Sequence, residues 1–117
     1  MHLARNSKMD LKSICLEYFE TFSRKDLDGL ALMFTGDVTL RDWEISATGI
    51  DDVVAANKKI FDSVEYIHVM PLHLYRDTNT VVAELSIVVS GAVHLSVVDV
   101  IKFNDTGKII SIRAYKG

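Results

Sequence analysis

The spacing of apolar residues predicts helices in the first half of the chain. From Met9 to Phe22 the large apolar residues recur at the i, i+3, i+4, i+7 spacing of an amphipathic helix, and Tyr18 lies in the middle of that apolar stripe. Asp26 can cap a second, short helix that extends to Phe34. The chain therefore begins with two predicted helices, and the first has a tyrosine on its buried side.

A short strand and a third helix are predicted next. Gly36 permits a turn into residues 38–42, which alternate between apolar and polar as a strand does. Thr48 is followed three residues later by Asp51, which resembles a capping box with Asp in place of Glu. The apolar spacing beyond it predicts a third helix that ends around Ser63.

After this helix the apolar period changes to two, which predicts strands over residues 65–75, 80–89, 92–104 and 108–115. Their connections are short and rich in turn-forming residues, so consecutive strands are expected to be antiparallel neighbours. Pro71 cannot donate a backbone hydrogen bond, so we expect a bulge or a sheet edge there. The whole pattern predicts an α+β fold: three N-terminal helices, with a short strand between the second and third, packed on a curved antiparallel sheet.

Strand alternation places two carboxyl groups on faces that are otherwise apolar. The two sets of alternate positions are Val38, Leu40 and Asp42 in the early strand, and Leu95, Val97, Asp99, Ile101 and Phe103 in the later one. Burying an ionised carboxylate without a partner costs roughly several kcal/mol. Each carboxyl should therefore pair with a cation, be protonated or border a cavity.

These possibilities have different consequences. Arg41 or Arg113 could supply the cation, and an Asp at a strand end, such as Asp42, can simply form a turn. A tyrosine in an apolar stripe can likewise be ordinary core. A protonated carboxyl beside a cavity would instead indicate chemistry, because a neutral carboxylic acid can donate a hydrogen bond. We expect an apolar pocket into which Tyr18, Asp42 and Asp99 point.

Length and composition are those of one globular domain over residues 1–117, with residues 1–8 expected to be a disordered N-terminus. The chain has 117 residues, of which 49% are hydrophobic, and a single Pro. Its net charge of -3 comes from scattered residues without a run of five like charges, which argues against nucleic-acid or membrane partners. Cys15 is the only cysteine, and no signal peptide or membrane span is evident, so we expect a cytoplasmic protein without an intrachain disulfide.

Histidine spacing gives no sign of a metal site. His68 and His73 are five residues apart on a predicted strand, which places them on opposite faces. The other two histidines have no partner at ligand spacing. We expect neither a metal nor another cofactor.

The second face of the predicted sheet is more apolar than a solvated face requires. It carries Val82, Val88, Val98 and Val100 among polar residues. We therefore expect a homodimer that forms through this face.

Five segments, together with the order of elements, resemble a known family. The order of helices and strands is similar to that of the cone-shaped domain of ketosteroid isomerases, SnoaL-like polyketide cyclases and nuclear transport factor relatives. The segments resemble the steroid Δ5-3-ketoisomerases in particular, and they are residues 18–19, 25–30, 37–42, 98–104 and 107–115. The resemblance spans nearly the whole chain and implies a cystatin-like cone that encloses an apolar pocket.

The resemblance also implies roles for the three polar residues. The general base of the isomerases falls on Asp42, their oxyanion tyrosine falls on Tyr18, and their protonated aspartic acid falls on Asp99. The implied reaction moves a carbon–carbon double bond into conjugation with a ketone, without a cofactor, on a small apolar carbonyl compound such as a steroid. Two alternatives remain open: a SnoaL-like cyclase or dehydratase acting on a polyketide-like substrate, and a ligand-binding domain without catalysis.

Three positions depart from the isomerase pattern. Trp43 stands where those enzymes usually have Pro, and Asn57 stands about where they have a tyrosine that supports the oxyanion tyrosine. Lys116 replaces an apolar residue, and it either reaches a ligand carboxylate or extends into solvent. We expect these three residues to line the pocket together with Val97 and Ile101.

Overall fold

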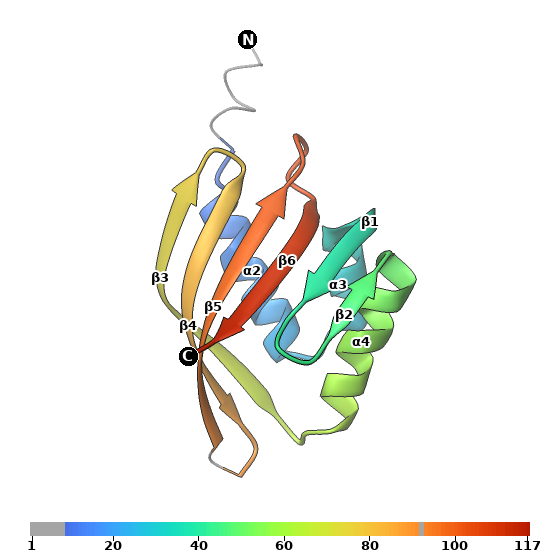
Figure 1. Cartoon of the computed structure of the whole chain (residues 1–117), viewed down its shortest axis with the longest axis vertical. Coiled ribbons are helices and arrows are strands. Elements are labelled where there is room, and N and C mark those ends of the chain that lie inside the picture. The colour runs from blue at the N-terminus through green and yellow to red at the C-terminus, as the bar shows by residue number, and fades with distance from the viewer. Residues whose placement is uncertain (1–8, 92) are drawn as a thin grey trace.

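The computed structural model describes residues 9–91 and 93–117, so the expected disordered N-terminus lies outside the described residues. Three helices pack on one side of a six-stranded sheet in this part of the chain (Figure 1). The predicted α+β fold is thereby confirmed. The elements are α2 (Leu11–Ser23), α3 (Leu27–Met33), β1 (Phe34–Arg41), β2 (Ser46–Thr48), α4 (Ile50–Asp62), β3 (Ile67–Asp77), β4 (Thr80–Val89), β5 (Val93–Phe103) and β6 (Ile109–Lys116).

Aspartates cap the first two helices. The Asp10 carboxylate accepts a hydrogen bond from the Ser13 backbone N–H at 3.1 Å, and the Asp26 carboxylate accepts one from the Gly29 backbone N–H at 2.9 Å. The capping box predicted for the third helix is wrong. Thr48 is paired in strand β2, so the cap position of α4 falls on Gly49, which has a φ of 89° and no side-chain cap.

The sheet has the order β2-β1-β6-β5-β4-β3. All neighbours are antiparallel except β1 and β6, which are parallel, so the prediction of a fully antiparallel sheet is wrong at this one ladder. The turn predicted at Gly36 is also absent, because β1 begins at Phe34 and runs through that glycine. An irregularity of register between Phe34 and Thr39 accommodates the start of the strand.

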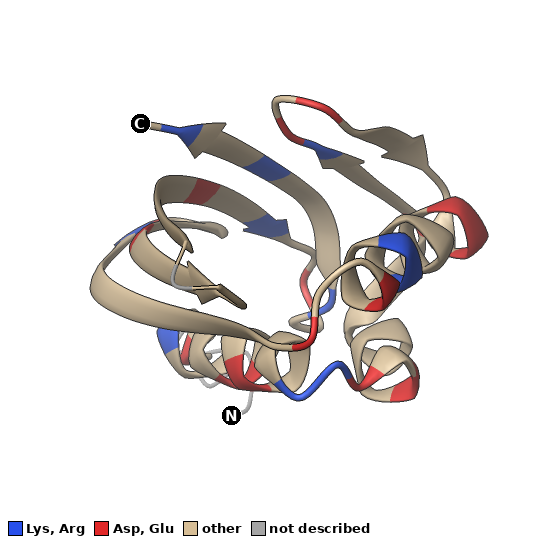
Figure 2. Ribbon diagram, turned by 90° about the horizontal axis from the view of Figure 1, so that it is seen from below, with Lys and Arg blue, Asp and Glu red and all other residues tan. Residues whose placement is uncertain are grey.

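Strand β3 lies at the edge of the sheet, and its register with β4 shifts between Pro71 and His73. The proline therefore sits at both an edge and a bulge, as predicted. The sheet bends toward the helices (Figure 2), which places its concave face opposite α2 and α4. Acidic residues lie mainly on the helices and loops in this view. The inner face of the sheet is formed mostly by apolar side chains.

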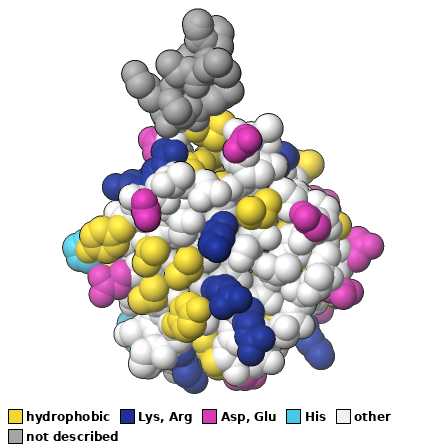
Figure 3. Space-filling view, turned by 45° about the horizontal axis from the view of Figure 1, so that its top comes forward, with side chains coloured by type: hydrophobic (Ala, Val, Ile, Leu, Met, Phe, Trp, Pro, Cys, Tyr) yellow, Lys and Arg dark blue, Asp and Glu magenta, His cyan; other side chains and the backbone are white. Residues whose placement is uncertain are grey.

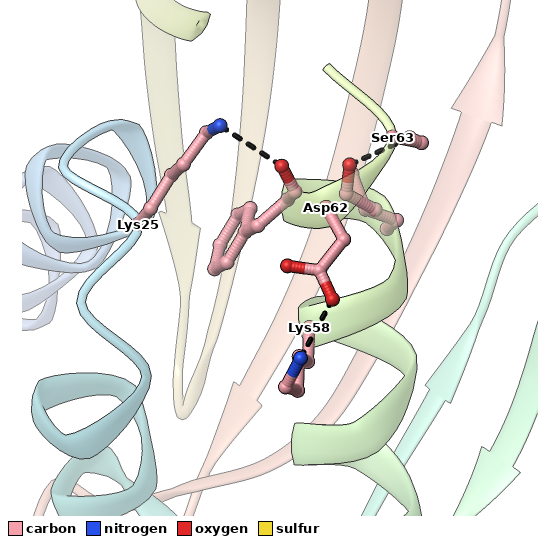
Figure 4. Close-up of polar contacts among 6 residues, drawn as sticks. Lys25, Lys58, Asp62 and Ser63 are labelled. Atoms are coloured by element: carbon pink, nitrogen blue, oxygen red, sulfur yellow. Dashed lines mark hydrogen bonds and ion pairs between the residues drawn. The ribbon is translucent and has the colours of Figure 1, made fainter. Parts of the chain in front are cut away.

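A lysine ties the loop after α2 to the far end of α4 (Figure 4). Lys25 has a φ of 58°, and its Nζ donates hydrogen bonds to the carbonyls of Phe61 at 2.9 Å, Val64 at 2.5 Å and Glu65 at 3.1 Å. A cation is favourable at a helix C-terminus because the last carbonyls there have no partner within the helix. Lys25 thus holds the corner between α4 and β3, which forms one wall of the cavity described next.

Candidate functional site

A cavity of about 460 Å³ lies between the helices and the concave face of the sheet, within the range of small-molecule sites. Apolar side chains from α2, α4 and the strands form most of its wall. The structure brings Tyr18, Asp42 and Asp99 to this one cavity, although they come from a helix, a strand end and a central strand. An apolar site with few polar groups suits a mostly apolar ligand that is oriented by specific hydrogen bonds.

Asp99 lies on the floor of the cavity, with 8% of its surface exposed. Its neighbours in register on β4 and β6 are Ala83 and Ala114, whose small side chains leave room around the carboxyl group. Arg113 is the neighbour of Val100 and is exposed on the opposite face of the sheet. The cation pairing considered from the sequence therefore does not occur with this arginine.

The Asp99 carboxyl is without a cation partner among the described residues, whose one ion pair joins Lys58 and Asp62. Burial, and secondarily the negative charge of Asp42 in the same cavity, raises the pKa of Asp99 from 3.8 to about 7. The carboxyl is therefore largely protonated at slightly acid pH, and it can donate a hydrogen bond into the cavity.

Tyr18 is held on α2 by aromatic neighbours and is 5% exposed. Its ring centroid lies 5.5 Å from that of Phe19 and 6.3 Å from those of Phe22 and Phe34, in tilted arrangements. Burial, followed by the charges of Asp99 and Cys15, raises the pKa of the Tyr18 phenol above its ordinary value. The phenol therefore keeps its proton and remains a hydrogen-bond donor.

Asp42 lies just after β1 and is half-buried. Its Oδ1 accepts hydrogen bonds from the backbone N–H groups of Glu44 at 2.7 Å and Ile45 at 2.6 Å. The residue is thus a turn former and a cavity-lining carboxylate at once. These bonds fix the orientation of the carboxylate through one oxygen, and the second oxygen accepts no hydrogen bond from the described residues.

The five predicted lining residues divide four to one. Trp43, Asn57, Val97 and Lys116 line the cavity, whereas Ile101 is fully buried and does not. Ile101 lies two residues beyond Asp99 along β5, between Val81 and Ile112, and its side chain is fully buried. Alternation identified its face correctly but could not tell where along the strand the cavity ends.

The rim carries an aromatic and a basic residue. The Nζ of Lys116 lies 5.3 Å from the centroid of the Trp43 ring, a cation–π distance, and both side chains remain partly exposed. Lys116 therefore contacts an aromatic side chain at the rim and remains accessible to solvent.

The sequence did not identify the wall formed by the end of α4 and the start of β3, which includes Ile60, Val64 and Ile67. The apolar stripe of α4 was a usable signal for Ile60, but the corner itself depends on the long-range contact of Lys25. Cys15 on α2 is fully buried, and burial raises the pKa of its thiol to about 12.

Residues 9–91 and 93–117 lack two features that would bear on function. These residues include no cluster of three or more His, Cys, Asp or Glu side chains that could hold a metal ion. They also include no helix that is both long and apolar enough to cross a membrane.

The fold and its apolar cavity are those of a cone-shaped α+β protein, and comparison with known proteins places the chain in a family. Residues 16–112 match the model of the SnoaL-like domain. The chain belongs to the SnoaL-like domain family. No curated protein sequence matches it.

Solved structures agree with this fold. A candidate SnoaL-like polyketide cyclase from Shewanella denitrificans OS-217 is similar with a TM-score of 0.82 at 14% identity, over 92% of this chain and 90% of that one. A protein with a ketosteroid isomerase-like fold from Catenulispora acidiphila gives 0.78 at 18% identity, over 87% and 83%. The epoxide hydrolase/cyclase-like enzyme SalBIII, described in pyran ring formation in the polyether salinomycin, gives 0.76 at 25% identity, over 96% and 94%.

Proposed function

We propose that this protein is an enzyme that transfers a proton within a small, mostly apolar carbonyl compound, so that a double bond moves into conjugation with the carbonyl. The observation that carries the proposal is the pair of carboxyl groups in one apolar cavity. Asp99 is buried without a described cation partner, and its pKa is raised to about 7, whereas Asp42 is held at the rim by two backbone donors. Two carboxyls in such different surroundings are suited to opposite roles.

In this reaction Asp42 removes a proton from the carbon next to the carbonyl and becomes a carboxylic acid. The electron pair of the broken C–H bond moves into the conjugated system, and negative charge develops on the carbonyl oxygen. Tyr18 and protonated Asp99 donate hydrogen bonds to that oxygen. Asp42 then returns the proton two carbons further along, which restores the carbonyl and leaves the double bond in conjugation.

The energetic contributions of these groups are substantial. A positioned general base accelerates proton transfer by roughly 10²–10⁴-fold. Removing one preorganised donor from an oxyanion site costs about 10²–10³-fold in rate in a typical case. The apolar wall strengthens both effects because it keeps water away from the charge that develops.

A second candidate, a cyclase, is supported by the family match and by the 25% identity to SalBIII over nearly the whole chain. In that reaction Asp42 would accept the proton of an attacking hydroxyl group, and Asp99 would donate its proton to the oxygen that leaves. The same two carboxyls would then close a ring instead of moving a double bond.

The experiment that tests the isomerase is to add a 5-ene-3-ketosteroid and to follow the absorbance of the conjugated enone. Wild type should exceed the buffer rate, and Asp42→Asn and Asp99→Ala should lose most of the excess. If wild type turns the steroid over no faster than buffer does, the proposal that the substrate is a steroid is wrong. A hydroxy-epoxide offered in parallel, with ring closure followed by mass spectrometry and chromatography, tests the cyclase.

A phenol titration separates either enzyme from a binding domain that lacks catalysis. A phenol mimics the oxyanion, so its affinity should fall in Tyr18→Phe and in Asp99→Ala. If binding is indifferent to both substitutions, the proposed oxyanion site does not exist.

A further inference from the structure

A second hollow, of about 470 Å³, lies beside the cavity, between the end of β1 and the end of β6. Its lining residues are Arg41, Asp42, Trp43, Arg113, Ala114, Tyr115 and Lys116. Three of them are basic and one is acidic. The proposed reaction uses only the acidic residue, Asp42, and leaves the basic side chains without a role.

Two of the basic residues, Arg41 and Arg113, lie side by side. They are partners in the parallel ladder of β1 and β6, and neighbouring strands are about 4.8 Å apart. The preceding partners, Leu40 and Ile112, are buried, so alternation directs both arginines to the outer face of the sheet, where both are exposed. Like charges in this arrangement repel each other, and an anion bound between them removes the repulsion.

No carboxylate of the described residues forms an ion pair with either arginine. The one ion pair in residues 9–91 and 93–117 joins Lys58 and Asp62, both on α4. Asp42, the acidic residue of the hollow, accepts hydrogen bonds through Oδ1 from the backbone N–H groups of Glu44 and Ile45 instead. The two guanidinium groups are therefore available to an anion on a ligand.

The hollow lies at a gap in the sheet. The ladder between β1 and β6 ends at the pair of Arg41 and Arg113, although β6 continues to Lys116 (Figure 1). Beyond this pair, alternation places Tyr115 on the outer face and Ala114 on the inner face, and both line the hollow. The hollow is thus bordered by residues from both faces of the sheet.

The hollow and the cavity adjoin each other. Asp42, Trp43, Ala114 and Lys116 line both spaces. Ala114 is also the register partner of Asp99, so the hollow begins one strand away from the carboxyl on the cavity floor. The Trp43 ring and the apolar stem of Lys116 border the passage from one space to the other. A ligand whose carbonyl group reaches Asp99 can therefore extend a tail toward the two arginines.

We infer that Arg41 and Arg113 form a subsite for an anionic group, a carboxylate or a phosphate, on a ligand whose apolar body occupies the cavity. The inference rests on the proposed function, which assigns the carbonyl end of the ligand to Tyr18 and Asp99. Guanidinium groups suit both anions, because their planar N–H donors match the oxygens of either. The substrate class becomes an apolar carbonyl compound with an acidic tail.

The test uses naphthols, which are phenols of a size that suits the cavity. The series consists of 6-hydroxy-2-naphthoate and two homologues with one or two CH₂ groups between the ring and the carboxylate. Each acid is compared with its primary amide, which has a similar shape and no charge. A second arm replaces the carboxylates by phosphonates. Affinities are measured by fluorescence titration at low salt for wild type, Arg41→Gln and Arg113→Gln.

Lys102→Gln is the matched control. Lys102 is exposed on the same outer face, with Thr80 and Ser111 as its register partners, and it does not line the hollow. This substitution removes the same charge from the same face of the sheet. It therefore separates long-range attraction from binding at the hollow.

At least one anionic naphthol should bind wild type about 5- to 20-fold more tightly than its amide, as expected for a charge-assisted hydrogen bond that is partly exposed. The preference should fall in both arginine variants, persist in Lys102→Gln and shrink as salt is added, because salt screens exposed charges. The arm with the larger preference identifies the anion as carboxylate or phosphate. If no anion is preferred, or if the preference survives both arginine substitutions or is lost equally in Lys102→Gln, the inference is wrong.

Failure of the proposed oxyanion site would give a different result. Tyr18→Phe and Asp99→Ala should weaken the anionic naphthols and their amides alike, because both carry the same phenol. If neither substitution weakens the amides, the proposed function is wrong. If the amides are weakened but no anion is preferred by wild type, only the arginine subsite is refuted.

Discussion

The floor and the rim of the cavity place the same type of residue in opposite surroundings. On the floor, Asp99 is buried between two alanines without a described cation partner. At the rim, Asp42 is half-buried, and two backbone N–H groups hold one of its oxygens. The first environment disfavours a charge and the second accommodates one. The surroundings of each carboxyl, and not its residue type, therefore set the role to which it is suited.

The largest expected effect comes from removing Asp42, the proposed base at the rim. Asp42→Asn should lower kcat by roughly 10²–10⁴-fold, because an amide cannot accept the substrate proton. The amide oxygen can still accept from the Glu44 and Ile45 N–H groups, so the thermal unfolding temperature should change little. Enone absorbance and a thermal melt measure the two quantities. An active variant, or one that unfolds early, would contradict the role assigned to the rim.

Asp99 on the cavity floor should make the free energy of unfolding depend on pH. The pKa of Asp99 is about 7 in the folded chain and near its ordinary value of 3.8 when unfolded. Between these values the folded state binds the extra proton, so the stability contributed by this group is full at low pH and is lost as the pH rises toward 7. The total loss is on the order of a few kcal/mol.

Asp99→Asn removes this titration and keeps the shape of the side chain. Urea unfolding of both proteins is measured at intervals from pH 4 to pH 8. The free energy of unfolding of the variant should rise relative to that of wild type as the pH rises, with no further change above about pH 8. Parallel curves for the two proteins would mean that the carboxyl is not perturbed by its surroundings.

The corner that closes the cavity should contribute a smaller amount. Lys25→Met removes three hydrogen bonds, one to the last turn of α4 and two to the residues that follow it, and should lower the free energy of unfolding by about 1–3 kcal/mol. Lys58→Met is the matched control, because its ion pair with Asp62 is 62% and 64% exposed and should be worth under about 0.5 kcal/mol. If urea unfolding shows the same loss of stability in both variants, the Lys25 hydrogen bonds do not stabilise this corner more than an exposed ion pair does.

The outer face of the sheet contrasts with the enclosed one and remains the predicted dimer surface. Apolar side chains gather there beside lysines and arginines (Figure 3), and Val98 lies between Glu84 and Tyr115 in register. Glu84 and Arg113 share this face and give it both signs of charge, which suits a self-complementary contact. Val98→Lys should weaken a dimer about tenfold, or about 1.4 kcal/mol. Sedimentation measures the change, and a monomeric wild type would refute the surface.

The smallest effect is expected at the entrance of the cavity. Lys116→Met removes the cation that lies over the Trp43 ring but keeps an apolar stem, and a partly exposed contact of this kind is worth about 0.5–1 kcal/mol. The affinity for a neutral naphthol should therefore change by less than about fivefold. A larger loss, confined to ligands with a carboxylate, would show instead that Lys116 binds the ligand directly.

Local chemistry was enough to predict most of the elements and the faces of the residues that matter. The 3.6-residue period of α2 placed Tyr18 inside, and the period of two in β5 placed Asp99 inside, because side-chain direction follows directly from backbone repeat. The three-residue strand β2 was not predicted, since it is too short to display a period. Thr48 was consequently assigned to a helix cap when it pairs with Thr39.

Sequence patterns alone were thus enough for the fold class, for the order of every described element except β2, and for the approach of Tyr18, Asp42 and Asp99 to one apolar space. Three features emerge only in the folded chain: β1 pairs in parallel with β6, Ala83 and Ala114 flank Asp99, and the Nδ2 of Asn57 is buried without a partner among the described residues. The difference lies in how far apart in the sequence the interacting residues are. The face of a side chain depends on a few neighbouring residues, whereas strand register, cavity length and hydrogen-bond partners depend on contacts between residues far apart in the chain.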